Sequence, residues 1–456
     1  MRSSLSTPYE IWQQQFNQRI IRVLDQQIHT SATLYLGCSG GMDSMLLLHL
    51  FAQIVPKRLH VISIDHQLQS KSAVWSQMVA DQCQKYNVKC SVIPVEVGSG
   101  NLEAAARHAR YKTFEDFLQP NDVLILAHHE QDQAETVLLR LLQGAGAGGL
   151  SAMHTLEQRI SFQSNAYLLW RPFLDCSKDT IMHMVEQLEL NYVDDPMNHD
   201  TDYDRVWCRE NLWPLLEERF PKMQQAIGRC AVLMQDANQI LEDVLAQDIQ
   251  LCVNEKKHNL DLSALTQLSN ARQRQLLSVW MQADNQYRPP LAMVERLKQE
   301  VWQAKEDASS VLHYAGYYFT RFGNYLYRYT AQEWQSFQPI KHDIKINFAL
   351  GDCISVASGQ FLIDQVSIGL DPQLLTQELN IFARRGGEKI KLYGRDVHRP
   401  LKKIIQDSKI APWYRHQIQI LMYHNTVLGV FTSKGFWLVQ NEFCQDNGWL
   451  PQQVVK

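Results

Sequence analysis

The hexapeptide Ser39-Gly40-Gly41-Met42-Asp43-Ser44 decides how this chain folds. It follows the apolar run 34–36 and leads directly into the apolar run 45–48, a pattern that predicts a strand, a tight turn and a helix. Two adjacent glycines allow a sharp turn that brings backbone N–H groups close to a ligand. The helix start adds unpaired donors and the positive end of the helix dipole. Such a turn favours anions, and phosphate above all.

The acidic residue of the hexapeptide separates it from the most familiar phosphate loop. That loop ends in Gly-Lys-Ser/Thr, whereas here Asp43 stands among the phosphate donors. A carboxylate at this place is useful through Mg²⁺. The structural alternative is an ordinary glycine-rich turn between a strand and a helix. The pattern Ser-Gly-Gly-x-Asp-Ser resembles the signature of the PP-loop ATP pyrophosphatases, a family that splits ATP between the α- and β-phosphates and leaves AMP on the substrate.

Length and composition indicate a globular protein of several domains. A chain of 456 residues has room for about three domains of roughly 150 residues each. Hydrophobic residues at 45% and charged residues at 20% are ordinary, and a net charge of -4 leaves any nucleic-acid surface to be found locally. The nine cysteines include no Cys-x-x-Cys pair, and no segment reaches the roughly 20 apolar residues that span a bilayer. We therefore expect reduced thiols and a cytoplasmic protein without a membrane anchor.

Strand-like and helix-like runs alternate along the first part of the chain. Helices are expected between strands that we place at 34–36, 61–64, 90–95 and 123–126. The alternation predicts the fold class α/β, with a parallel sheet that helices cover on both faces. Ligands of such sheets bind beyond the carboxyl ends of the strands, and each polar motif of this segment falls at or just beyond such an end.

Those motifs supply candidate ligands. Asp65 closes the second strand, where an acid can accept a hydrogen bond from a nucleotide, although a solvated loop aspartate is the alternative. Arg107 lies on a predicted helix, where surface salt bridging is the alternative. Asp132 and Glu135 share one face of the helix after the fourth strand. These two acids could complement the helix dipole, hold Mg²⁺, or grip the ammonium group of a cationic substrate.

Two segments follow that helix. The glycine-rich stretch 143–150 predicts a mobile loop over the site. The polar, turn-rich stretch that begins at Asp195-Pro196 carries Arg205 and Arg209, which suggests contact with phosphate or RNA. An interdomain linker with solvated charges is the alternative.

The remaining chain divides into a helical and a strand-rich part. We expect an ATP-binding catalytic domain at 1–217, a mainly helical middle domain at 218–331, and a small basic α+β domain at 332–456. Gly323-Asn324 between two aromatic runs predicts a hairpin just before the last boundary. Basic residues gather in the last domain around Trp413 and Tyr414, rings available for stacking on bases. The candidates for RNA contact are Arg384, Arg385, Lys389, Lys402, Lys403 and Arg415. A solvated basic face is the alternative.

Taken together, these segments resemble the bacterial tRNA(Ile)-lysidine synthetase family over nearly the full chain. The motifs that carry the resemblance are 39–44, Asp65-His66, Glu103-x-x-Ala-Arg107-x-x-Arg110-Tyr111, Ala127-His128-His129-x-x-Asp132-Gln133-x-Glu135-Thr136, Gly144-x-Gly146 with Gly149-Leu150-x-x-Met153, Arg171-Pro172, Asp195-Pro196-x-Asn198, and Arg385-x-Gly387 to Trp413.

The resemblance implies an ATP-dependent ligase that joins L-lysine to C2 of the wobble cytidine in the isoleucine tRNA with a CAU anticodon. An adenylated cytidine is the implied intermediate and lysidine the product. ATP would be held by Ser39, Gly40, Gly41, Met42, Asp43, Ser44 and Asp65, with Mg²⁺ on Asp43. Catalysis would rest on Asp43, Asp132 and Glu135, the last two holding lysine together with Arg107. The tRNA would be contacted by Arg205, Arg209 and the basic residues of the last domain.

Three positions depart from the family pattern and leave details of RNA contact open. Gln67 stands where a glycine is common, Val206 replaces a usual asparagine, and Gln419 replaces a usual proline. The rival interpretations are another PP-loop enzyme, such as a tRNA thiolase or an amidotransferase-linked synthetase, and a catalytically silent RNA-binding homologue. A thiolase would want paired catalytic cysteines, a linked glutaminase would want a cysteine where Arg2 stands, and the intact site disfavours a silent homologue. The sequence leaves the oligomeric state open, with a homodimer as one option.

Overall fold

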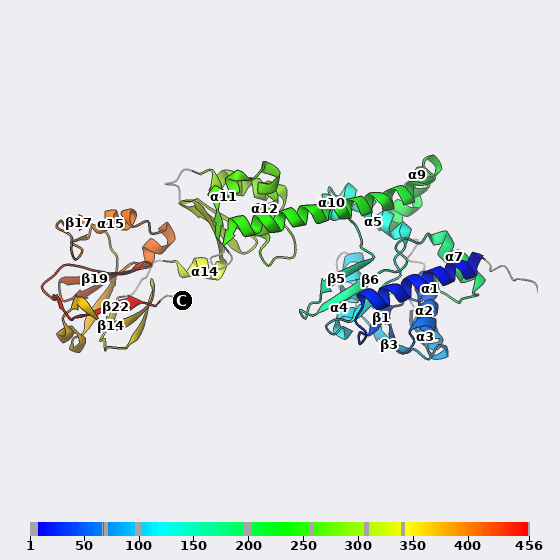
Figure 1. Ribbon diagram of the computed structural model, residues 1–456, viewed down its shortest axis with the longest axis horizontal. Coiled ribbons are helices and arrows are strands. Elements are labelled where there is room, and N and C mark those ends of the chain that lie inside the picture. Colours follow the sequence, from blue (N-terminus) through cyan, green and yellow to red (C-terminus); the bar gives the residue numbers. More distant parts are fainter. Residues whose placement is uncertain are drawn as a thin grey trace, which may run out of the picture. The chain divides into compact units, whose positions relative to one another are not determined.

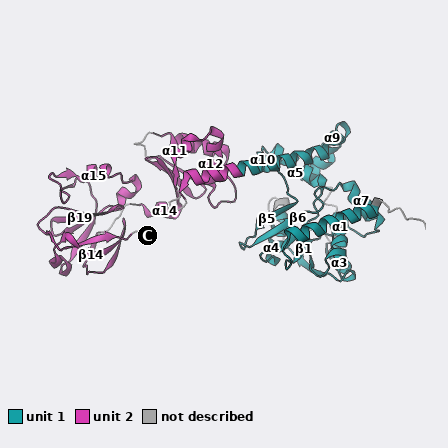
Figure 2. Ribbon diagram, in the orientation of Figure 1, with its two compact units in different colours: residues 1–242 teal, residues 243–456 magenta. Residues whose placement is uncertain are grey.

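The computed structural model (Figure 1) describes residues 8–65, 67, 72–95, 102–194, 203–254, 259–304, 310–338 and 343–454. The chain separates into two compact units, residues 1–242 and 243–456 (Figure 2). The long helix α10 (Met223–Cys252) contributes residues to both. The three expected domains, with boundaries after 217 and 331, therefore stay a prediction. His66, the side chain of Glu103 and the motif 195–198 lie outside what the structure describes.

Unit 1 is built on a six-stranded sheet in the order β3-β2-β1-β4-β6-β5. The strands are β1 (Leu34–Gly37), β2 (Leu59–Asp65), β3 (Lys89–Pro94), β4 (Val123–Ile125), β5 (Leu156–Ile160) and β6 (Ala166–Trp170). Neighbours from β3 to β6 pair in parallel, whereas β5 pairs antiparallel with β6. The predicted parallel sheet is confirmed, and the hairpin β5–β6 at its edge was not predicted.

Alternating side chains of the strands serve two separate cores. Leu34 and Leu36 of β1 pack into one core, and Tyr35 between them packs into the other. Successive side chains of a strand point to opposite faces, so a sheet whose strands are apolar throughout must be covered on both sides. The first core takes side chains from α1 (Pro8–Gln27), α2 (Met42–Ile54), α3 (Ser72–Lys85) and α7 (Lys178–Gln187), and the second takes them from α4 (Leu102–Phe117). The expected helix on each face is therefore present.

The helices expected between the four predicted strands are present as α2, α3 and α4. The apolar stripe of the first helix, including Phe16 and Ile20, is buried. The bounds are α1 (Pro8–Gln27), α2 (Met42–Ile54), α3 (Ser72–Lys85), α4 (Leu102–Phe117), α5 (Glu130–Leu142), α6 (Ala147–Leu150), α7 (Lys178–Gln187), α8 (Asp204–Trp207), η2 (Cys208–Leu212) and α9 (Trp213–Arg219). None of the helices in the described ranges combines the length and the apolar character that a bilayer crossing requires.

The first part of unit 2 joins helices to a five-stranded sheet, β7-β8-β11-β10-β9. The predicted hairpin is β10 paired with β11, with Gly323 in its turn at a φ of +57°. The helices are α11 (Leu262–Gln267), α12 (Asn270–Gln282), α13 (Leu291–Arg296), η3 (Leu297–Trp302) and α14 (Ala331–Ser336), and the strands are β7 (Val253–Asn254), β8 (Asn259–Asp261), β9 (Val311–Tyr314), β10 (Tyr317–Phe322) and β11 (Tyr325–Thr330).

The second part of unit 2 is rich in strands, as expected. One sheet has the order β12-β15-β18-β19-β20, and in another β14 pairs with β13, β21 and β22. The elements are β12 (Ile344–Ile346), β13 (Cys353–Val356), β14 (Gly359–Leu370), η4 (Pro372–Thr376), β15 (Leu379–Ala383), β16 (Lys389–Ile390), β17 (Arg399–Pro400), α15 (Leu401–Asp407), η5 (Pro412–Gln417), β18 (Gln419–Tyr423), β19 (Thr426–Thr432), β20 (Gly435–Leu438), β21 (Cys444–Asp446) and β22 (Trp449–Gln453).

Candidate functional site

The glycine turn between β1 and α2 has the predicted form. Gly40 adopts a φ of +84°, a left-handed conformation that favours glycine. Ser44 Oγ donates to the carbonyl oxygen of Gly41 at 2.9 Å, and the N–H of Gly41 donates to Ser39 Oγ at 3.4 Å. These bonds hold the turn against the first residues of α2, Met42 and Asp43. The N–H groups at this helix start form a site suited to phosphate.

A cleft of about 400 Å³ opens beside this turn, at the carboxyl ends of β1, β2 and β4. Part of its wall is apolar and includes Ile62, Phe114 and Leu126. The rest is polar and includes Ser39, Gly41, Asp43, Ser44, Arg110, His128 and Asp132. An apolar wall suits a heterocyclic base, and the polar side suits phosphate and charged groups. The cleft therefore has the two surfaces that a nucleotide requires.

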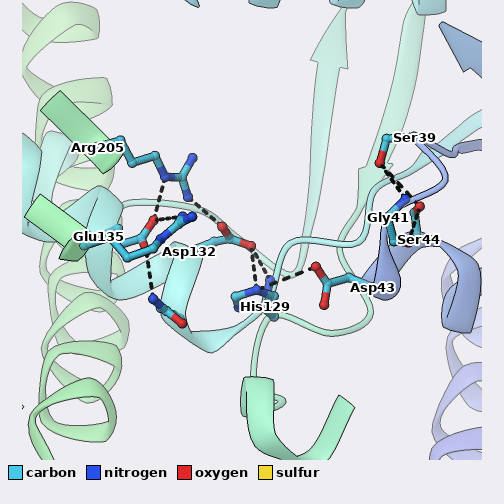
Figure 3. A network of polar contacts seen from close by, with 10 residues as sticks. Ser39, Gly41, Asp43, Ser44, His129, Asp132, Glu135 and Arg205 are labelled. Carbon is cyan, nitrogen blue, oxygen red and sulfur yellow. Dashed lines mark hydrogen bonds and ion pairs between the residues drawn. The ribbon is translucent and has the colours of Figure 1, made fainter. Parts of the chain in front are cut away.

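A chain of polar contacts leads from the glycine turn to the start of α5 (Figure 3). His129 Nε2 lies 3.8 Å from Asp43 Oδ2 and 3.6 Å from Asp132 Oδ2. The backbone N–H of His129 donates to Asp132 Oδ2 at 2.9 Å, so this carboxylate caps its own helix. Asp43 and Asp132 thus stand on either side of one imidazole.

Two arginines extend this chain on the other side of Asp132. Arg205 donates from Nη2 to Asp132 Oδ1 and from Nε to Glu135 Oε2, both at 2.6 Å. Arg209 donates from Nε to Glu135 Oε1 at 2.8 Å and from Nη2 to Glu135 Oε2 at 3.0 Å. The side chain of Glu135 is 0% exposed and that of Asp132 is 17% exposed. The sequence correctly predicted that Asp132 and Glu135 lie side by side, but it did not predict that both arginines would pair with these acids.

Burial and neighbouring charges act differently on the ionisable groups of the cleft. Burial raises the pKa of Asp43, and the nearby His129 opposes that rise. Burial also raises the pKa of Asp132, but the charges of His129 and Arg205 outweigh it and lower this pKa to about 2. Burial lowers the pKa of His128 to about 3, so this imidazole is neutral. The cleft therefore holds two different carboxylates. The lowered pKa of Asp132 favours its ionised form, whereas the raised pKa of Asp43 disfavours its ionised form.

The other residues expected to hold ATP or lysine lie around the cleft with different accessibility. Asp65 is almost buried, and its Oδ1 accepts the N–H of Gln67 at 2.9 Å. Gln67 has a φ of +53°, which gives a physical reason why glycine would suit that position. Arg107 lies on the exposed side of α4 with its guanidinium 5.1 Å from the centre of the Tyr111 ring. From the same helix it is Arg110 that lines the cleft.

The glycine-rich stretch after α5, expected to be a mobile loop, includes an element that was not predicted. It contains the short helix α6, and several side chains fix it to its neighbours. Arg140 Nη1 donates to the carbonyl oxygen of Gly149 at 2.8 Å. Gln133 Nε2 and Gln235 Nε2 both donate to the carbonyl oxygen of Met153, at 2.8 and 3.0 Å. The mobile loop over the site stays a prediction, although glycine content alone did not reveal α6 or these hydrogen bonds from α5 and α10.

The predicted basic residues of the last domain differ in their surroundings. Arg384 Nε lies 3.7 Å from Glu388 Oε2, and Arg385 pairs with Asp343 at 3.0 Å with its side chain 76% exposed. Arg415 donates from Nε to the carbonyl oxygen of Ile410 at 2.9 Å. Burial and the charge of Arg384 lower the pKa of Arg415. The exposed lysines are Lys389, Lys402 and Lys403.

The remaining departures from the expected motifs have structural roles. Gln419 is buried, and its Oε1 accepts the N–H of Ala357 at 3.0 Å. Val206 is a buried residue of α8 and follows Arg205 directly in the chain. Trp413 was expected to be available for stacking, but it is only 6% exposed and packs at 5.2 Å against Tyr327. Most of its ring surface therefore serves the core of unit 2.

Comparisons with known proteins cover the whole chain. The family model of the PP-loop domain matches residues 12–216, that of the TilS substrate binding domain matches 260–327, and that of the TilS substrate C-terminal domain matches 379–450. A tRNA(Ile)-lysidine synthase of Acinetobacter baylyi is 49% identical and covers 100% of this chain and 97% of its own length. That of Alkalilimnicola ehrlichii is 32% identical, covering 90% of this chain and 94% of its own. That of Actinobacillus pleuropneumoniae serotype 3 is 30% identical, covering 88% and 96%.

Proposed function

The chain belongs to the tRNA(Ile)-lysidine synthase family, and from that premise we propose how its residues divide the work of making lysidine on tRNA. The enzyme uses ATP to join lysine to the wobble cytidine of the isoleucine tRNA with a CAU anticodon. The C2 oxygen of cytosine is a poor leaving group. Transfer of AMP to that oxygen releases pyrophosphate, and the lysine amine then attacks C2 and expels AMP with the oxygen.

We assign the ATP phosphates to the turn and helix start formed by Ser39, Gly40, Gly41, Met42 and Ser44. The assignment rests on the N–H donors of this turn and on the dipole of α2. Asp65 is assigned to the adenosine, because β2 ends beside β1 at the edge where the cleft lies. The absence of a lysine in the turn fits an enzyme that transfers AMP to its substrate and releases pyrophosphate.

Asp43 is the residue that we assign to Mg²⁺. Its Oδ1 is buried and makes no hydrogen bond within the described part of the chain, so it is available to a cation. The described residues contain no group of three or more His, Cys, Asp and Glu side chains that could hold a metal by themselves. Mg²⁺ commonly binds through one or two carboxylates together with substrate phosphates and water. When bound, the ion would neutralise phosphate charge, and the part of Asp43 would be to hold the ion at the start of α2.

Lysine is assigned to the acids of α5. Asp132 lines the cleft and is the more accessible of the two, so it is the carboxylate that an incoming amine reaches first. Glu135 holds Arg205 and Arg209 and, through Arg205, sets the orientation of Asp132. Arg107 remains our candidate for the lysine carboxylate or for a phosphate of the tRNA. An ionised Asp132 and a cationic amine form a charge-assisted pair.

The tRNA is assigned to Arg205 and Arg209 beside the cleft and to the basic residues of the last domain. Phosphate contacts by lysine and arginine position an RNA without reading its sequence. The exposed side chains of Arg385, Lys402 and Lys403 are suited to that role. Arg384, Lys389 and Arg415 complete the assigned surface. Because its tRNA substrate is a cytosolic molecule, we also place the enzyme in the cytoplasm, and sedimentation will test whether it is a homodimer.

The chain of contacts from Asp43 to Glu135 carries this proposal, and the variant Asp43→Asn tests it. Burial raises the pKa of Asp43, so the neutral amide should not reduce the thermal stability. Pyrophosphate release in the presence of lysine and the tRNA should fall by about 100-fold or more, because the charge on the phosphate side is lost. Asp25→Asn, the same change at an exposed position of α1, is the control. Turnover of Asp43→Asn within threefold of the control would exclude the assigned role.

A further inference from the structure

A second cleft lies in unit 2, far along the chain from the glycine turn. Its volume is about 310 Å³, and elements β9, β10, α14 and η5 contribute to its wall. Three aromatic side chains line it, those of Trp334, Phe337 and Trp413. Polar side chains share the wall, including Arg321, Gln338 and His416. Aromatic surface with a few polar groups is the usual composition of a small-molecule site.

The aromatic wall is held by packing and hydrogen bonding. The Trp334 ring stacks on Tyr318, with ring centroids 5.2 Å apart and planes at 7°. Gln417 is buried, and its Nε2 donates to the carbonyl oxygen of Ser336 at 2.8 Å, which ties η5 to α14. Side chains that are fixed before a ligand arrives lose little conformational freedom on binding. The cleft is therefore preformed.

Arg321 supplies a fixed positive charge at this wall. Its Nε donates to the carbonyl oxygen of Gly323 at 3.1 Å, and its Nη1 donates to that of Trp302 at 2.5 Å. Its Nη2 makes no hydrogen bond with any residue that the structure describes. No carboxylate is among the described residues that line the cleft. A charged donor without a neighbouring acid favours an anionic ligand.

The cleft also belongs to the basic segment of the last domain. Helix η5 contributes Trp413 and His416 to the wall and carries Arg415 between them. Four residues, 408–411, separate it from α15, where Lys402 and Lys403 are exposed. A polyanion that binds this segment would bring its own charged groups to the mouth of the cleft.

We propose that this cleft binds one unstacked nucleotide of the tRNA, with its base against Trp334 and its phosphate facing Arg321. The inference rests on the proposed function, which supplies the tRNA. Bases of loops and single-stranded ends can leave the RNA stack and lie on aromatic side chains. A nucleotide combines a planar heterocycle with an anion, the two features to which the rings and the guanidinium are complementary. Gln338 and His416, both exposed at the cleft, supply hydrogen bonds to the base edge.

The test measures the affinity of the full-length enzyme for a transcript of the CAU-anticodon isoleucine tRNA. Trp334→Ala should raise the Kd by about 5- to 150-fold, the range for loss of one base-stacking contact. Trp334→Phe should keep most of the affinity because it keeps an aromatic face. The dependence of Kd on salt should not change in either variant, because the ring carries no charge. Tyr287→Ala, which removes a 75% exposed ring elsewhere in unit 2, is the matched control.

A second pair of variants decides the matter if Trp334→Ala fails to fold. Gln338→Ala and His416→Ala change exposed side chains, and each should raise the Kd by about 2- to 12-fold. Values within twofold of the wild-type Kd for every folded variant would overturn the inference, and a cleft that serves a peptide would give that result. Failure of the proposed function is distinguishable, because the wild-type enzyme would then form no AMP with lysine and tRNA.

Discussion

Replacement of Glu135 by glutamine is the sharpest test of the ion pairs that join Arg205 and Arg209 to the acids of α5. The change keeps the shape of the side chain but removes the buried charge that pairs with Arg205 and Arg209, although Asp132 still pairs with Arg205. Removal of one partner of a buried ion pair costs about 3 to 5 kcal/mol. The two arginine side chains are 25% and 26% exposed, so water can partly solvate them after the change. We therefore expect the low end, a loss of about 3 kcal/mol in the free energy of unfolding of unit 1.

Calorimetry can detect a loss of this size. For a unit of residues 1–242, each kcal/mol lost from the free energy of unfolding lowers the melting temperature by about 2 to 4 °C. The melting temperature of unit 1 should therefore fall by about 6 to 12 °C. The transition of unit 2 serves as an internal reference. Glu186→Gln is the matched control, since Glu186 is exposed on α7. A fall of less than about 2 °C in Glu135→Gln would refute the argument that the two arginines depend on this carboxylate.

Three further changes test other parts of the structure. The pKa of Asp132 is lowered to about 2, so its ionised form stabilises the fold above the unfolded pKa of about 3.9, and this contribution is lost as pH falls from about 4 to 2. Between about pH 4 and pH 2, the free energy of unfolding of the wild type should therefore fall by about 2 kcal/mol more than that of Asp132→Asn. Reversal of charge at Lys402 and Lys403 should flatten the salt dependence of tRNA affinity, and identical slopes would mean a merely solvated face. Gly37→Ala should lower the free energy of unfolding by about 1 to 3 kcal/mol, because a Cβ atom there would lie 2.7 Å from Phe114 Cζ. An unchanged melting temperature would contradict that close approach.

Local signals in the sequence were enough to place the glycine turn between β1 and α2. The strand, turn and helix around Gly40 follow from residues within ten positions of one another, and such short-range patterns need no tertiary information. The acids Asp132 and Glu135 were also found correctly as neighbours, because the spacing of three residues fixes them on one helix face. Prediction succeeded where the geometry of a single element determined the answer.

Long-range pairing explains what the sequence did not reveal. The hairpin β5–β6 carries no strong turn signal, and β6 joins the sheet only because β4 offers it an edge. Likewise the hydrogen bond that Gln235 donates to the carbonyl oxygen of Met153, just after the glycine-rich stretch, joins residues 82 positions apart in the chain. Nothing in the local composition of either segment encodes such a partner.

The pairing of Arg205 and Arg209 with Glu135 follows from the burial of that carboxylate. From sequence, Arg205 and Arg209 read as RNA contacts, because they lie in a polar stretch. Burial of Glu135 gives them a second role, since an unpaired charge in the interior would cost several kcal/mol and the carboxylate requires cationic partners. Arg205 lies 70 residues away and meets this need, while its second donor fixes Asp132. A phosphate of the RNA that contacts either guanidinium group would share it with Glu135, so replacement of these arginines should affect the lysine site as well as tRNA binding.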